Sequence, residues 1–71
     1  MYPDDRPLTP RLVAVIAGGA LGETMAETAA RLHVSPKTVD AERRAAYARL
    51  GARNMPHAVA LAYQRGLLGA P

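Results

Sequence analysis

The chain has 71 residues, contains no cysteine and carries a formal net charge of +3 at pH 7. This length suits one small domain, and the missing cysteines exclude a disulfide framework and a thiolate metal site. No apolar run is long enough to cross a bilayer, and the N-terminus does not resemble a signal peptide, so we expect a soluble, cytoplasmic protein. Because so small a core is only marginally stable alone, dimerisation is expected to contribute to stability.

The positive charge is concentrated in the second half of the chain. Residues 1–34 have a net charge of −1, whereas residues 35–71 have a net charge of +4, from six Lys or Arg side chains against two carboxylates. A basic segment of this kind is typical of a surface that binds a polyanion. An alanine-rich helix with solvated arginines has a similar composition, so charge alone leaves both interpretations open.

The chain begins with a segment, residues 1–7, that lacks hydrophobic periodicity and is expected to form a flexible arm. A first helix is predicted from Pro10, with Thr9 as its N-cap. The residues expected on its inward face are Leu12, Val15, Ile16 and Ala20. Gly18 and Gly19 fall late in this helix, where they indicate either an early helix end or a close contact with another helix.

A second helix is predicted after Gly22, ending at about Leu32. Thr24 and Glu27 have the spacing of a capping box, in which each side chain bonds to the backbone N–H group of the other residue. Its buried side is expected to carry Ala29 and Leu32, with either Met25 or Thr28. Residues 33–35 are then expected to form a tight turn.

The segment after this turn predicts a third helix that begins at Pro36 and ends at about Leu50. Ser35 can cap its first N–H groups, and Val34 and Val39 form a hydrophobic staple across its start. The expected inward residues are Val39, Ala46 and Leu50, with Gly51 as the stop. Two helices joined by such a turn, with basic residues on the second, are typical of a helix-turn-helix, whose second helix lies in the DNA major groove.

A fourth helix is predicted between the N-cap Asn54 and Gly66, and the two leucines that follow are expected to fold back on the core. The expected inward residues are Ala58, Val59 and Ala62, with Tyr63 as a further candidate. No strand is expected. The prediction is therefore an all-α domain of four helices over residues 8–68, followed by a short tail at residues 69–71.

The outward side of the third helix is predicted to carry cations separated by small side chains. At 100° per residue, the residues facing outward are Lys37, Ala41, Arg44 and Ala48, flanked by Asp40 and Ala45. Arg44 suits a bidentate contact to guanine, and Lys37 suits a contact to guanine or phosphate. Arg43 lies near the inward stripe and must extend along the helix to reach phosphate or solvent. The alternative is that these are ordinary exposed residues of an ordinary helix.

Two carboxylates on the same helix oppose a DNA-binding role, because they repel phosphate. Asp40 is expected either to accept a hydrogen bond from a cytosine amine or to form an i, i+4 pair with Arg44. Glu42 is placed toward the packed side of the helix, where Arg43 or Arg31 is its expected partner.

The sequence contains no catalytic constellation. His33 falls in the turn and His57 at a helix start, without acidic residues at metal-ligand spacing, so both are expected to be surface or capping residues. Ser35 is explained by capping. We therefore expect no enzyme activity, no metal and no cofactor.

A series of short motifs runs along the chain without a gap from Leu8 to Leu68. In order, they are Leu8-Thr9-Pro10-Arg11, Glu27 with Ala29, Leu32, Ser35-Pro36-Lys37-Thr38-Val39, Arg49-Leu50-Gly51, Arg53-Asn54, Ala58-Val59 and Gly66-Leu67-Leu68. Together they closely resemble the LuxR/GerE-type helix-turn-helix domain. The chain is similar to the small stand-alone members of that family, which lack a receiver or ligand-binding domain.

The resemblance implies a bacterial or phage transcription regulator that binds double-stranded DNA as a homodimer, with the third helix reading the major groove and the fourth making the dimer contact. The reading positions that it implies are Lys37, Thr38, Asp40, Ala41 and Arg44. The helical wheel adds Arg43 beside them, and the resemblance places Thr24 at a phosphate-contacting position. The outward residues that become dimer candidates on the fourth helix are Ala60, Leu61 and Gln64.

This sequence departs from the family pattern near the expected DNA face. Asp40 stands where a lysine is usual and Glu42 where a histidine is usual, and Met25-Ala26 replaces a usual polar-basic pair. The loss of positive charge is expected to weaken non-specific binding to DNA.

Three interpretations are consistent with the sequence. The leading hypothesis is a sequence-specific DNA-binding regulator that acts as a homodimer on an inverted repeat. The alternative is a protein-interaction module with weakened DNA affinity that binds another regulator or RNA polymerase. A third interpretation, a relative of the sigma-factor promoter-recognition region, fits the third helix, but the fourth helix and the Gly66-Leu67-Leu68 ending favour the LuxR/GerE type.

Overall fold

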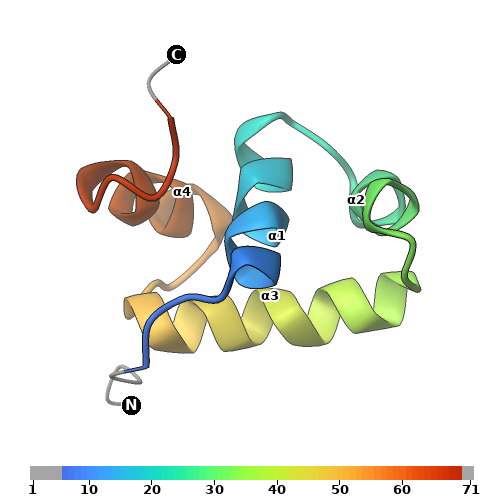
Figure 1. Ribbon diagram of the computed structural model, residues 1–71, viewed down its shortest axis with the longest axis horizontal. Helices are drawn as coiled ribbons and strands as arrows, with labels where there is room; N and C mark the ends of the chain where they lie inside the picture. Colours follow the sequence, from blue (N-terminus) through green and yellow to red (C-terminus); the bar gives the residue numbers. More distant parts are fainter. Residues whose placement is uncertain (1–5, 70–71) are drawn as a thin grey trace.

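The computed structural model describes residues 6–69 and confirms the predicted order of four helices (Figure 1). These are α1 (Pro10–Ala20), α2 (Met25–Leu32), α3 (Pro36–Leu50) and α4 (Met55–Gln64). The described part of the chain contains no strand, as expected for an all-α domain. Most of the predicted N-terminal arm and the end of the predicted tail lie outside the described residues.

Side-chain caps at the predicted positions begin all four helices. The residues whose side chains accept a backbone N–H group three residues later are Thr9, Thr24, Ser35 and Asn54. The predicted capping box is complete, because the Thr24 N–H donates to Glu27 Oε1 at 2.8 Å and the Glu27 N–H donates to Thr24 Oγ1 at 3.1 Å. Each such cap stabilises its helix by about 1 kcal/mol, so the sequence itself determines where the helices begin.

Helices α1 and α3 form the centre of the packing, since each contacts the three other helices. In Figure 1, α1 lies between α2 and α4 and above α3. The buried cluster between α1, α3 and α4 consists of Leu12, Ile16, Ala46, Leu50, Ala58 and Ala62. A second cluster, between α1, α2 and α3, consists of Val15, Ala29 and Val39. Helix α3 is therefore backed by core along most of its length, which leaves its opposite side to solvent.

Three predicted inward positions had to be decided or corrected. Ala20 was predicted to be buried but is exposed, because α1 points away from α3 at its C-terminal end (Figure 1). Tyr63 was a further candidate for the core of α4 but is 40 % exposed, because the inward line of this helix runs through its two buried alanines. On α2 the buried residue is Thr28 and not Met25, and the Thr28 hydroxyl donates to Glu23 Oε1 at 2.8 Å.

The two adjacent glycines of α1 mark close helix contacts. The helix continues through both to Ala20, so the alternative of an early helix end is wrong. A Cβ atom at Gly18 would lie 2.4 Å from Thr28 Oγ1 on α2, and one at Gly19 would lie 2.3 Å from Met55 Sδ on α4. The absence of side chains here allows both neighbouring helices to approach α1.

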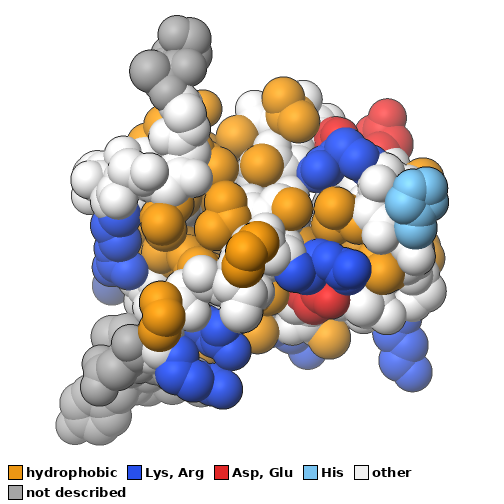
Figure 2. Space-filling view, in the orientation of Figure 1, with side chains coloured by type: hydrophobic (Ala, Val, Ile, Leu, Met, Phe, Trp, Pro, Cys, Tyr) orange, Lys and Arg blue, Asp and Glu red, His pale blue; other side chains and the backbone are white. Residues whose placement is uncertain are grey.

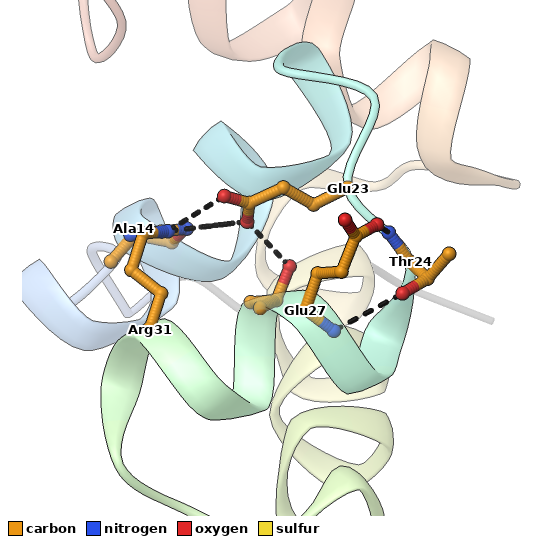
Figure 3. A network of polar contacts seen from close by, with 6 residues as sticks. Ala14, Glu23, Thr24, Glu27 and Arg31 are labelled. Atoms are coloured by element: carbon orange, nitrogen blue, oxygen red, sulfur yellow. Dashed lines mark hydrogen bonds and ion pairs between the residues drawn. The ribbon is translucent and has the colours of Figure 1, made fainter.

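A polar network fixes α2 on α1 (Figure 3). Arg31, at the end of α2, forms an ion pair with Glu23 Oε2 at 3.0 Å and donates from Nη2 to the Ala14 carbonyl oxygen of α1 at 3.0 Å. The hydrogen bonds from Arg31 and Thr28 hold the pKa of Glu23 below its ordinary value. The orientation of the first half of the helix-turn-helix thus depends on packing and on this network together.

Within residues 6–69, no helix combines the length and apolar character needed to span a bilayer. Nor does this part of the chain bring together three His, Asp or Glu side chains that could hold a metal ion.

Candidate nucleic-acid interface

The turn between α2 and α3 is fixed from both sides. His33 ends α2 in the left-handed conformation, with φ of 60°, and the Val34 N–H donates to the Ala29 carbonyl oxygen at 3.0 Å. Ser35 then caps α3 by accepting the Thr38 N–H at 3.1 Å. Val34 packs against the cluster that contains Val39, as the predicted staple requires. These contacts determine the angle at which α3 leaves the turn.

The solvent side of α3 presents the cations and small side chains that the helical wheel predicted. Lys37, Ala41 and Arg44 are exposed, and we call these three residues the α3 face. The side chain of Arg44 is 74 % exposed. Figure 2 shows Lys and Arg side chains spaced along the part of the surface where α3 lies, with acidic surface beside them. Ala48 is half-buried, so the exposed positions of α3 end at Arg44, just past the middle of the helix.

Asp40 lies beside this face and uses both carboxylate oxygens. Its Oδ2 forms an ion pair with Arg44 Nη2 at 3.2 Å, and its Oδ1 accepts a hydrogen bond from Arg43 Nη2. The bond from Arg43, together with the positive charge of Arg44, holds the pKa of Asp40 below its ordinary value. The predicted i, i+4 pair is therefore present, and the pairing with Arg43 is an addition that the wheel did not suggest.

Arg43 lies along the flank of α3 and not on its exposed face. Its side chain is only 29 % exposed, and the guanidinium carbon is 5.5 Å from the centre of the Tyr47 ring. The hydrogen bond with Asp40 raises the pKa of Arg43. The spacing of Arg43 and Tyr47, i and i+4, was the sequence signal for this contact.

The prediction for Glu42 was wrong in its partner. Glu42 Oε1 pairs with Arg11 Nη1 of α1 at 3.2 Å, and not with Arg43 or Arg31. The two expected partners are already paired with Asp40 and Glu23, whereas α1 packs on the side of α3 where Glu42 lies. The other oxygen, Oε2, is buried without a hydrogen-bond partner, which lowers the net stability of this pair.

Thr24 lies exposed at the start of α2, with its oxygen accepting the Glu27 N–H at 3.1 Å. The hydroxyl keeps its own hydrogen to donate, which is what a contact to a phosphate oxygen requires. Thr38 is half-buried, and its hydroxyl is 3.0 Å from Ser35 Oγ.

The predicted dimer residues of α4 do not share one exposed surface. Ala60 and Gln64 are exposed, whereas Leu61 is half-buried and packs against the core of its own chain. Sequence reasoning missed the exposed apolar side chains nearby, Tyr63 at 40 % and Leu67 at 37 %. Tyr63 had been a candidate for the core, and Leu67 had been expected to fold back on it.

The junction between α3 and α4 forms a shallow hollow lined by Gly51, Arg53, Asn54 and His57. The Arg53 N–H donates to His57 Nδ1 at 3.1 Å, and the His57 N–H donates to Asn54 Oδ1 at 2.9 Å. His57 is therefore a capping residue, as expected, and Arg53 adds an exposed cation at the end of α3.

Comparison with known families agrees with this geometry. The family model for bacterial regulatory proteins of the luxR family (GerE) matches residues 6–62, which include all of α1, α2 and α3 and most of α4. A comparison with curated proteins found no match. Proteins of this family are DNA-binding transcription regulators with a helix-turn-helix. The four helices, the capped turn and the extent of this match show that the chain belongs to the LuxR family of bacterial regulatory proteins and carries its GerE-type helix-turn-helix domain.

Proposed function

We propose that this protein is a sequence-specific DNA-binding regulator that inserts α3 into the major groove. The observation that carries the proposal is the α3 face: Lys37, Ala41 and Arg44 are all exposed on a helix that is capped at its start and backed by core. A rigid helix with small side chains between two cations can approach base edges closely.

The exposed residues differ in the contacts that suit them. Arg44 is exposed enough for a bidentate contact to guanine, and Lys37, in the first turn of α3, suits a phosphate or a guanine. Thr24 can donate its hydroxyl to a phosphate from the start of α2. Arg43 is held against Tyr47, so any phosphate contact by Arg43 requires its guanidinium to leave that position.

We propose that two copies pair through α4 to bind an inverted repeat. The support is a patch that joins Ala60 and Gln64, the exposed predicted residues, to Tyr63 and Leu67, which carry apolar surface into solvent. Leu61, the third predicted residue, is partly buried and packs against the core of its own chain. Such a dimer would present two α3 helices to half-sites related by two-fold symmetry.

Selection of bound fragments from random duplex DNA, followed by a salt series with the selected site, tests this function. Arg44→Ala should reduce affinity for the selected site more than affinity for a scrambled duplex, since one good bidentate pair contributes about 1–3 kcal/mol of discrimination. Arg53→Ala is the matched control: it removes the same charge outside the α3 face and should weaken binding to both duplexes equally. Failure to select any sequence at low salt would overturn the proposal.

The second candidate is a protein-interaction module that binds another regulator or RNA polymerase. The observation favouring it is that α3 carries Asp40 and Glu42, two carboxylates that oppose a phosphate backbone. This function predicts that Asp40→Lys creates DNA binding that the native protein lacks. Strong binding of the native protein to one selected site would exclude it.

A further inference from the structure

Asp40 pairs with two arginines, at i+3 and i+4, whose side chains differ in exposure to solvent. Asp40 Oδ1 holds Arg43, whose side chain is 29 % exposed, and Asp40 Oδ2 holds Arg44, whose side chain is 74 % exposed. We call these three residues the Asp40 cluster. One carboxylate is thus paired with an arginine on the flank of α3 and with an arginine on its exposed face.

Two contacts hold Arg43 on the flank of α3, where helical periodicity already places it. Asp40 binds its guanidinium from the preceding turn, and the Tyr47 ring lies 5.5 Å from it in the following turn. Contacts on both sides along the helix axis oppose movement of this guanidinium to the groove side of α3. This leaves Arg44 as the arginine of the cluster that extends into solvent.

Arg44 is exposed, but rotation of its side chain breaks an ion pair with Asp40. Its Nη2 atom is 3.2 Å from Asp40 Oδ2, so the guanidinium is turned back toward the N-terminal half of α3, where Lys37 and Ala41 lie. In a helix-turn-helix, the N-terminal residues of the second helix contact base edges. The ion pair engages Nη2, and the other guanidinium N–H groups remain available to an acceptor.

We propose that Asp40 is a positioning residue that determines sequence specificity: by holding Arg44 toward the base-reading end of α3, it increases discrimination between sites while it lowers affinity for DNA in general. The proposal rests on the DNA-binding function proposed above. A pre-aimed Arg44 loses less side-chain entropy when it meets its correct base. Non-specific DNA responds mainly to charge, and the carboxylate lowers the net positive charge that any duplex meets.

Asp40→Asn keeps the size of the side chain and removes its charge. Binding of this variant to the selected and to the scrambled duplex separates the effect on discrimination from the effect on general affinity. We expect tighter binding to a scrambled duplex, and a fall of about fivefold or more in the affinity ratio between selected and scrambled duplexes, which corresponds to the low end of the discrimination attributed to one bidentate arginine contact. In an Arg44→Ala background, Asp40→Asn should no longer change this ratio, because Arg44 is absent and the Arg43 that is released suits phosphate, which both duplexes offer equally.

Glu42→Gln is the matched control. It removes one negative charge from the same helix, but Glu42 pairs with Arg11 of α1 and not with a residue of the α3 face. It should therefore raise affinity for both duplexes and leave their ratio unchanged. Asp40→Glu, which keeps the charge, should restore part of the ratio.

A measurement without DNA completes the test. The Nε–H signal of Arg44 in the free protein should show slower side-chain motion in the native chain than in Asp40→Asn, at equal thermal stability of the fold. An unchanged affinity ratio in Asp40→Asn, with native site-specific binding, would overturn the positioning role and leave the DNA-binding function intact. Equal Arg44 mobility in both proteins would overturn it as well. Absence of duplex binding by the native chain would overturn both proposals.

Discussion

The substitution Gly18→Ala tests the helix packing that orients the helix-turn-helix. Gly18 is buried in α1, and an added Cβ would lie 2.4 Å from Thr28 Oγ1 and 2.8 Å from Glu23 Oε1. Neither atom can move away easily, because Thr28 is 3 % exposed with a stiff β-branched side chain, and Glu23 is fixed by Arg31. The substitution therefore separates α1 from α2 or breaks the Thr28–Glu23 hydrogen bond.

The expected change in the free energy of unfolding combines two destabilising contributions and one stabilising contribution. Overpacking of this kind costs about 1–3 kcal/mol, and a lost hydrogen bond costs about 1 kcal/mol more. Replacing glycine by alanine inside a helix returns about 1 kcal/mol. We expect Gly18→Ala to lower the free energy of unfolding by roughly 1–3 kcal/mol, which for a domain of this size is a fall in Tm of about 4 °C or more.

Gly19→Ala is the matched control on the neighbouring residue. Its Cβ would lie 2.3 Å from Met55 Sδ and 2.5 Å from Met55 Cγ, atoms of a flexible, half-buried side chain that can change rotamer. The gain in helix propensity should then offset most of the cost, so its Tm should stay within a few degrees of the native value. Thermal and urea unfolding followed by circular dichroism compare the two variants. Equal midpoints, or a Gly18→Ala protein more stable than Gly19→Ala, would refute the packing argument.

Further predictions concern individual interactions that hold the helices. The folded pKa of Glu23 lies below its ordinary value of 4.5, so its ion pair stabilises the fold above that pH, and this stabilisation is lost as the pH falls from 4.5 through the lowered folded pKa; the urea midpoints of the native chain and Glu23→Gln should differ at pH 7, and the difference should shrink as the pH is lowered below 4.5. Ser35→Ala removes the cap of α3 and should lower the free energy of unfolding by about 1 kcal/mol, measured by urea titration. Gly51→Ala places a side chain at φ of 72° and should lower the free energy of unfolding by about 1–2 kcal/mol in the same assay. Arg11→Ala breaks the partly exposed pair with Glu42 and should lower it by under about 1 kcal/mol.

Local chemistry made the helix boundaries predictable. Capping depends on residues only three positions apart, so the sequence contains the whole interaction, as Thr24 with Glu27 and Ser35 with the Thr38 N–H group show. The exposure of Lys37 and Arg44 also follows from helical periodicity alone.

Interactions between helices were not predictable in the same way. The partner of Glu42 is Arg11, 31 residues away, and only the crossing of α1 over α3 brings them together. The role of the two glycines was ambiguous for the same reason, because the atoms that fill the space beside Gly18 and Gly19 come from α2 and α4. The pairing of Asp40 with Arg43 was missed although both residues lie in one helix, because the i, i+4 spacing favoured Arg44 and the carboxylate reaches both arginines of the next turn.

Whether α3 reads DNA is tested by mapping backbone amide chemical shifts on addition of the selected duplex to the native protein. The largest changes are expected around Lys37, Ala41 and Arg44 of α3, with a smaller change at Thr24. Changes confined to α4, or an α3 that does not respond to the duplex, would contradict a DNA-reading role of α3.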